Sequence, residues 1–325
     1  MLSVSFLNLA LTTPIFADEI PLTSLNLVGN SPNTSQLVVN SQNQTVLRLT
    51  PNYDTNVGGG PPAGAAWTKS TYDVAGPFSV NFQFQMSDPC IGDGSAGSCI
   101  SDLGHGGDGI AFVIQDSSSS GPFSTGFGDT ALGEGAGGMG FLGIKDSVAV
   151  MLDTYQNVGD PDSYGDPSNN YIAVNTRKTD FNVPHHFCTD GQLTDQPGSL
   201  SDLPIPYGGC TASPTLGMST VPLTDNMDLG VHNVEIIYTG SMLDVYLDSV
   251  LYLSVAIDLA TALDLQGGDG AFLGFTAGTR FAYQNQDILS FSESPIPEPA
   301  WGQLWVPLAM LIAVALGRKW KRARP

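Results

Sequence analysis

The sequence has few basic residues. It contains 11 Lys and Arg against 31 Asp and Glu, which gives a formal net charge of −20. Five of the basic residues lie between positions 318 and 324, so only six remain in the rest of the chain. A chain this acidic repels phosphate backbones, which argues against nucleic acid as a partner. Acidity is compatible with binding divalent cations and neutral glycans.

Cysteines are also few, and none has the Cys-x-x-Cys spacing that is typical of zinc sites. Four cysteines in an exported chain indicate disulfide bonds. Three pairings are possible, and proximity along the chain favours Cys90–Cys99 and Cys188–Cys210. A Gly-x-Ser-x-Gly motif is absent as well, so nothing supports a serine hydrolase.

No long stretch between residues 18 and 293 shows a helical period, and 38 Gly and 22 Pro interrupt the chain. In residues 78–86 apolar and polar side chains alternate, which predicts a half-buried strand. One short helix is expected over 257–265. Similar runs of β-branched and aromatic residues predict further strands: 45–50, 109–115, 147–155, 171–176, 234–238, 243–247, 251–257, 271–276 and 288–292. Many short strands separated by tight turns predict one all-β domain, an antiparallel sandwich or jelly roll.

The N-terminus has the order of a secretory signal peptide. An apolar run, Pro14 and the small Ala17 precede the acidic Asp18 and Glu19. No Lys or Arg stands before the apolar run, so the pattern is incomplete. We expect residues 1–17 to be cleaved and the remaining chain to be exported.

The C-terminus combines Pro297-Glu298-Pro299, an apolar stretch over 304–316 and the basic cluster. Counted from Trp301, the apolar part has about 17 residues, the short limit for a membrane helix, here about 301–317. A plain membrane anchor would have the same spacing. The Pro-Glu-Pro favours another reading, because residues 294–325 resemble the PEP-CTERM sorting signal of Gram-negative bacteria. That resemblance implies processing by an exosortase, an inner-membrane intermediate, and delivery to the outer surface or extracellular matrix.

The segment VAVMLDTYQN, residues 148–157, carries the most chemical information. Asp153 and Asn157 bracket the end of a predicted strand, and Asp166 follows on a loop. Together with the main-chain carbonyl of Tyr155 they offer oxygen ligands, of which calcium takes about six to eight. Asp and Asn beside a turn also occur for turn geometry alone, so the spacing by itself leaves both interpretations open.

The same segment resembles the metal-binding strand and loop of legume-type (L-type) lectins. Further similar segments occur in the family's chain order: LNLVGNS, TVLRLT, AWTKSTYDV with FSVNFQFQM, GGDGIAFVIQ, GAGGMGFLG, VHNVEIIYTGSMLDVYLD and LGFTAGT with NQDILSFS. The resemblance extends over residues 18–293. It implies a legume-lectin-like (concanavalin-like) β-sandwich that binds glycans or exopolysaccharide and is not an enzyme.

The resemblance also implies roles for individual residues. Asp153, Tyr155 through its main chain, Asn157 and Asp166 would bind calcium. Asp108, preceded by a cis peptide bond from Gly107, would accept hydrogen bonds from sugar hydroxyls, and Asn157 would donate one. The main-chain N–H of Gly137 or Gly138 would donate another hydrogen bond, and the Tyr155 ring would stack on the apolar face of the sugar. The loop 277–283 would set the sugar preference, with contacts from Ala277, Gly278 and Thr279.

Two features depart from the plant members of the family. Met151 and Tyr171 stand where those proteins have a Glu and a His that bind a second, transition-metal ion. A thioether and a phenol do not replace these ligands, so we expect calcium and no manganese site. Asp166 lies three residues later than in plant sequences, and Asp160 or Asp162 could take its place.

Two other functions remain open. A retaining glycoside hydrolase on the same architecture needs paired carboxylates, and the strand at 147–155 offers only Asp153. A structural biofilm or matrix protein would have the sandwich without sugar binding. His185 and His186 are expected to be solvated loop residues. The sequence leaves open the sugar specificity and whether two copies pair through a sheet edge.

Overall fold

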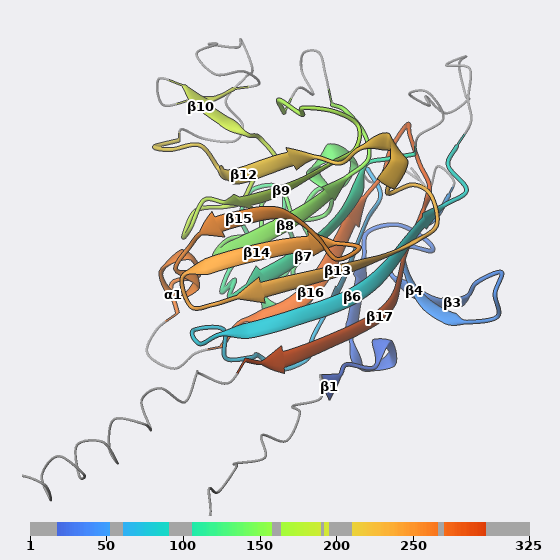
Figure 1. Ribbon diagram of the computed structural model, residues 1–325, viewed down its shortest axis with the longest axis horizontal. Helices are drawn as coiled ribbons and strands as arrows, with labels where there is room; N and C mark the ends of the chain where they lie inside the picture. The colour runs from blue at the N-terminus through green and yellow to red at the C-terminus, as the bar shows by residue number, and fades with distance from the viewer. Residues whose placement is uncertain are drawn as a thin grey trace, which may run out of the picture.

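In the computed structural model, the described residues are 18–52, 61–90, 106–157, 164–189, 192–194, 210–265 and 270–296. They form an antiparallel sandwich of two sheets, which confirms the predicted all-β class (Figure 1). The predicted signal peptide and residues 297–325 of the predicted tail lie outside the described residues. No helix in the described ranges is both long and apolar enough to cross a membrane.

One sheet has seven strands and the other has eight. The seven-stranded sheet runs in the order β12 (Thr215–Thr220), β9 (Tyr171–Thr176), β8 (Ser147–Asp153), β7 (Gly109–Gln115), β16 (Phe272–Gly278), β5 (Ala63–Trp67) and β2 (Asn26–Gly29). The eight-stranded sheet runs in the order β15 (Val250–Ala256), β14 (Met242–Leu247), β13 (Val231–Tyr238), β6 (Phe78–Ser87), β17 (Asn285–Pro295), β4 (Thr45–Thr50) and β3 (Gln36–Val39), and β1 (Asp18–Glu19) pairs with β17.

The remaining elements are short. The predicted helix is present as α1 (Leu259–Ala262), which begins after Asp258, whose side chain accepts a hydrogen bond from the Thr261 N–H. The others are a small hairpin and four 3₁₀ turns: β10 (Phe187–Thr189), β11 (Gln192–Thr194), η1 (Leu22–Ser24), η2 (Gly128–Thr130), η3 (Ala136–Gly138) and η4 (Leu223–Asp225).

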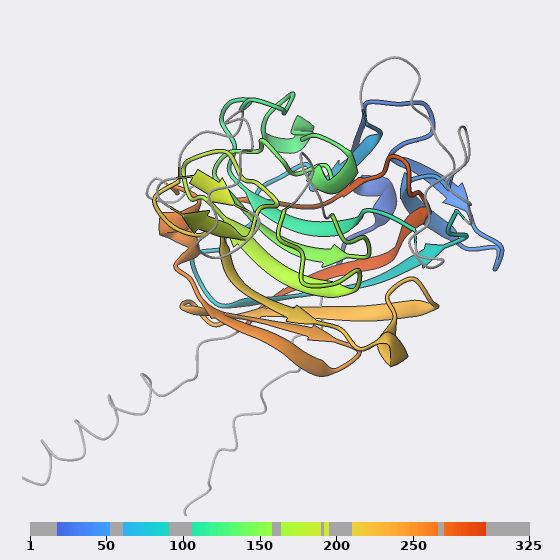
Figure 2. The same cartoon turned by 90° about the horizontal axis from the view of Figure 1, so that it is seen from above.

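The burial of the strands explains their sequence patterns. In β6 every second side chain is buried, as its alternation predicts, because only one face of β6 packs against the other sheet. All residues of β7 and β8 are buried. One face of these strands packs into the core between the sheets, and the other lies under a second apolar cluster that includes Trp67, Met139 and Phe141. Figure 2 shows the loops, in green, that cover this outer face.

The predicted bond between Cys188 and Cys210 is present, with the two Cα atoms 6.0 Å apart. It ties the segment after β9 to the start of β12. Cys99 lies outside the described residues, so the Cys90–Cys99 pairing stays a prediction.

Candidate functional site

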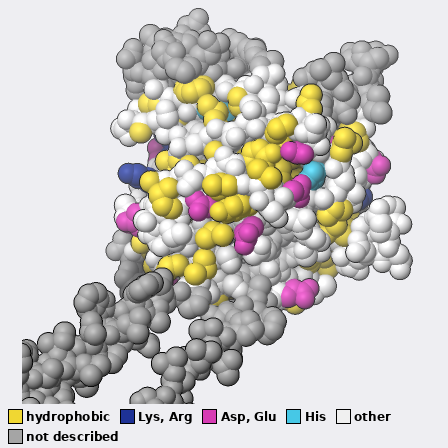
Figure 3. All heavy atoms as spheres, in the orientation of Figure 1, with side chains coloured by type: hydrophobic (Ala, Val, Ile, Leu, Met, Phe, Trp, Pro, Cys, Tyr) yellow, Lys and Arg dark blue, Asp and Glu magenta, His cyan; other side chains and the backbone are white. Residues whose placement is uncertain are grey.

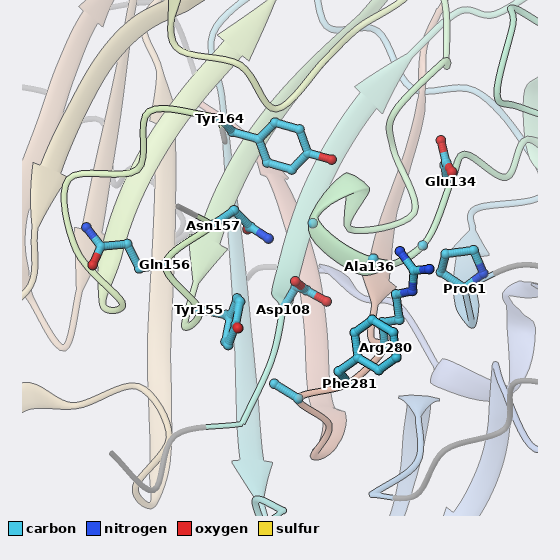
Figure 4. A pocket seen from close by; sticks show the side chains of 13 residues that line it. Pro61, Asp108, Glu134, Ala136, Tyr155, Gln156, Asn157, Tyr164, Arg280 and Phe281 are labelled. Carbon is cyan, nitrogen blue, oxygen red and sulfur yellow. The ribbon is translucent and has the colours of Figure 1, made fainter. Parts of the chain in front are cut away.

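A cavity of about 200 Å³ opens at the end of the seven-stranded sheet where β7 begins and β8 and β16 end (Figure 4). Its wall is built from segments far apart in the sequence: Asp108, residues 134–137, residues 155–157 with Tyr164, residues 280–282, and Pro61. Four residues that the sequence assigned to sugar binding, Asp108, Gly137, Tyr155 and Asn157, are among these. The fold therefore brings these four residues, half of the predicted sugar contacts, together around one cavity.

Asp108 directly precedes β7 and is held there by main-chain hydrogen bonds to segments on both sides. Its N–H donates to Gly278 O (2.9 Å), and its carbonyl accepts from Thr154 N–H (3.0 Å). The Gln286 amide of β17 donates to the carbonyls of Gly107 and Gly278, both at 3.0 Å. The predicted cis peptide between Gly107 and Asp108 is present. The carboxyl group, on a side chain that is only 4% exposed, points toward the cavity in Figure 4.

Two further carboxylates meet just beneath the cavity. Asp153 ends β8, and its Oδ1 accepts the Tyr155 N–H at 2.9 Å, so the chain turns here instead of continuing as a strand to residue 155 as predicted. Asp166 Oδ2 accepts the Asn157 N–H at 2.6 Å. The Tyr171 hydroxyl lies 2.7 Å from Asp166 Oδ1 and 3.2 Å from Asp153 Oδ2. The predicted calcium residues are thus neighbours.

No Lys or Arg side chain of the described residues neutralises these two carboxylates. Asp153 and Asp166 are buried, and among the described residues neither forms an ion pair with Lys or Arg. Burial, followed by the charges of Asp166 and Asp108, raises the pKa of Asp153 well above its usual range. A bound cation would remove this unfavourable charge, because it attracts the ionised carboxylates.

The donor set fits a hard cation. Asn157 Oδ1 is buried and has no hydrogen-bond partner within the described ranges. An unsatisfied buried oxygen is unfavourable, and coordination to calcium would satisfy it. The described residues contain no group of three or more His, Cys, Asp or Glu that could hold a metal. The ligands available here are instead two carboxylates, an amide and the Tyr155 carbonyl. Asp160 and Asp162 lie outside the described residues.

Gly137 lies directly against Asn157. A Cβ atom on Gly137 would stand 2.9 Å from both Oδ1 and Nδ2 of Asn157, and it would also overlap the Tyr164 ring. The Gly138 N–H already donates to Gly135 O at 3.0 Å. Of the two main-chain donors that the sequence proposed, we therefore assign the Gly137 N–H to the cavity.

Only part of the predicted loop 277–283 lines the cavity. Ala277, Gly278 and Thr279 are buried, and none of the three is in the cavity wall. The Thr279 hydroxyl donates to Ala282 O at 2.9 Å and so shapes the loop. The wall is formed by residues 280–282, where the Arg280 guanidinium lies 4.7 Å above the centre of the Phe281 ring. Sugar contacts from Ala277, Gly278 and Thr279 stay a prediction, and within the predicted loop residues 280–282 are the ones that face the cavity.

Two histidines expected in solvent are buried instead. His185 and His186 are each 1% exposed. His186 Nε2 lies 2.9 Å from the Tyr171 hydroxyl and 3.3 Å from Asp166 Oδ1. Burial, helped by His186 and Arg177, lowers the pKa of His185 to about 3. The expectation was wrong because this segment folds down onto β9, beside the Cys188–Cys210 bond.

The sequence matches no family model and no curated protein. Among solved structures, the chain is similar to the exoplasmic/lumenal domain of VIP36 in its Ca²⁺/Man-bound form, at 16% identity over 85% of this chain and 84% of that one, with a TM-score of 0.49. It is also similar to metal-free lectin I-B4 from Griffonia simplicifolia (17% identity, 84% and 93%, TM-score 0.49) and to lectin II from Ulex europaeus (17%, 86% and 97%, TM-score 0.49). Similarity at this level does not assign the chain to a family.

Proposed function

We propose that this protein is a calcium-dependent lectin that is exported and binds glycans without modifying them. One observation carries the proposal. A cavity with Asp108, Gly137 and Asn157 in its wall adjoins the buried carboxylates of Asp153 and Asp166, which accept the N–H groups of the wall residues Tyr155 and Asn157. Sugar-binding groups and cation-binding groups share Asn157, so the two kinds of binding are expected to be linked.

Each residue has a distinct task in this proposal. Asp153, Asp166, the Tyr155 carbonyl and Asn157 Oδ1 hold calcium, which neutralises the two carboxylates and fixes the Asn157 amide. The Asn157 Nδ2 group is then directed toward the sugar as a donor, beside the Gly137 N–H. Asp108 accepts from two sugar hydroxyls, and the Tyr155 ring packs against the apolar face of the sugar ring.

An open site of this size is expected to bind one sugar weakly. A dissociation constant of about 1 mM corresponds to about −4 kcal/mol. Several copies on one surface would raise the effective affinity by avidity. Export through residues 1–17 and sorting through residues 294–325, which we also propose, would place such copies on the outer surface or in the extracellular matrix, in contact with exopolysaccharide.

A glycan array with the purified protein, run with calcium and with a chelator, tests the proposal. We expect binding only with calcium, and its loss in Asp108→Asn, because one of the two acceptor oxygens becomes an NH2 group that can only donate. Asp73→Asn, at a surface turn, is the matched control and should bind as the original protein does. Equal binding in chelator would contradict the calcium role, and no binding at all would favour a structural matrix protein.

One observation favours a second candidate, a glycoside hydrolase on the same sandwich. Glu134 lines the same cavity as Asp108, so two carboxylates from different segments face one space. Hydrolysis of a bound oligosaccharide would require such a pair as acid and base or nucleophile. Incubation of the best array ligand with the protein, followed by assay of new reducing ends, distinguishes the two. The lectin proposal expects none.

A further inference from the structure

The Tyr171 hydroxyl occupies an unusual position. It lies on β9, fully buried, within hydrogen-bond distance of three atoms: Asp166 Oδ1 (2.7 Å), Asp153 Oδ2 (3.2 Å) and His186 Nε2 (2.9 Å). Its ring belongs to the apolar cluster on the outer face of the seven-stranded sheet. The ring explains the packing, and a phenylalanine would pack similarly. Packing does not account for the hydroxyl, whose contacts are with the two carboxylates and the imidazole.

A chain of hydrogen bonds continues behind this hydroxyl. His186 Nδ1 lies 2.7 Å from Thr215 Oγ1, and the Thr215 hydroxyl donates to Asn175 Oδ1 at 2.7 Å. Because the Thr215 proton is used on Asn175, the imidazole must donate from Nδ1 to Thr215. The Asn175 amide in turn donates to Val183 O at 3.0 Å and to His185 O at 3.3 Å. The imidazole is thus held in place from both sides.

We propose that Tyr171 and His186 are positioning residues for the calcium site: their contacts with Asp153 and Asp166 fix the separation and orientation of these two carboxylates. This inference rests on the proposed function. Two adjacent carboxylates repel each other, and the Tyr171 hydroxyl lies between them, 2.7 Å from Asp166 Oδ1 and 3.2 Å from Asp153 Oδ2. A proton donated to either carboxylate reduces this repulsion and orients both groups as ligands.

Calcium titration calorimetry on the purified protein tests this assignment. We expect a stoichiometry of one ion per chain in the original protein. Tyr171→Phe should keep the fold and raise the calcium dissociation constant by about 10- to 100-fold, the usual effect of removing a group that orients a metal ligand. Tyr238→Phe is the matched control, because Tyr238 is equally buried and its hydroxyl bonds only main-chain atoms, Ile257 O and Leu259 N–H.

A second variant guards against misfolding of the first. Thr215→Val removes the acceptor of His186 Nδ1 and leaves the carboxylates untouched, so it should also weaken calcium binding, by less than Tyr171→Phe. Thermal unfolding without calcium shows whether each variant folds. Calcium affinity unchanged in folded Tyr171→Phe overturns the inference, as does unchanged affinity in Thr215→Val if Tyr171→Phe does not fold.

The outcomes separate this inference from the proposed function. If the original protein binds no calcium, the proposed function fails and the positioning role falls with it. If the original protein and Tyr171→Phe bind calcium equally and both bind glycans, the lectin proposal stands and only the role of the hydroxyl is lost.

Discussion

At the scale of single residues, Gly137 lies where a very small change should alter binding most. A methyl group there would push into the Asn157 amide and the Tyr164 ring. We expect Gly137→Ala to displace Asn157 and to weaken both calcium and glycan binding by at least about 10-fold, as for other losses of a metal-ligand orientation. Parallel calorimetric titrations with calcium and with the array-identified glycan measure this effect.

Gly76→Ala is the control for this variant, because no heavy atom lies within 4 Å of a Cβ at Gly76. It should bind both ligands normally. If Gly137→Ala also binds both normally, Asn157 is not the link between the cation and the sugar, and the assigned geometry of the site is wrong.

At the scale of elements, β17 connects the two sheets beneath the site. It belongs to the eight-stranded sheet, but its Gln286 reaches the carbonyls of Gly107 and Gly278 at the end of the seven-stranded sheet. In Gln286→Met the Gly107 carbonyl loses its donor, while Gly278 O keeps the Asp108 N–H. A buried acceptor left without a donor costs about 1–3 kcal/mol, so we expect a loss of that size in the free energy of unfolding.

Urea denaturation measures this loss, with Gln83→Met as the control. The Gln83 amide donates to Asn233 at an exposed position, so its removal should cost less than about 0.5 kcal/mol. Glycan affinity should also fall in Gln286→Met, because the Gly107 carbonyl that loses its donor is in the peptide bond to Asp108. Equal stability of the two variants would show that this connection between the sheets is unimportant.

Strands with a clear pattern were predictable, and strands without one were not. All ten predicted strands are present, among them β7 and β9 with their predicted bounds. β5 was not among the predicted strands, because its residues AGAAW include no β-branched side chain. Its small side chains follow from close packing, because a Cβ at Gly64 would collide with the Leu49 carbonyl. Strand propensity depends on such neighbours, which local sequence does not reveal.

At the scale of the whole molecule, burial together with the excess of acidic residues raises the pKa of individual carboxylates. On the face shown in Figure 3, acidic side chains are more frequent than basic ones. Burial first, and then the charge of Asp264, raise the pKa of Asp146 to about 6. The folded protein therefore binds this proton more tightly than the unfolded chain does. Stability from this group rises as the pH falls below about 6 toward the unfolded value near 4, and the ionised group destabilises the fold above that range.

Asp146→Asn should remove this penalty. Residue 146 has a positive φ of 46°, which Asn tolerates as Asp does, so the backbone is not strained by the change. We expect a higher melting temperature than the original protein at about pH 7.5, with the difference shrinking toward pH 4. Glu19→Gln, which removes an exposed charge in β1, controls for net charge. A difference independent of pH would contradict the assignment to Asp146.

The sequence by itself predicted the antiparallel sandwich from strand alternation and turns, and its resemblance to L-type lectins singled out Asp108, Asp153, Asn157 and Asp166. These patterns lie along the chain and can be recognised without the fold. Only the tertiary structure decided that His186 reaches Asp166, which residues of the predicted loop 277–283 face the cavity, and that the Tyr171 hydroxyl lies between both carboxylates. These features depend on how loops far apart in the chain pack over the outer face of one sheet. That packing follows from long-range burial and from the Cys188–Cys210 bond, and no local pattern encodes it.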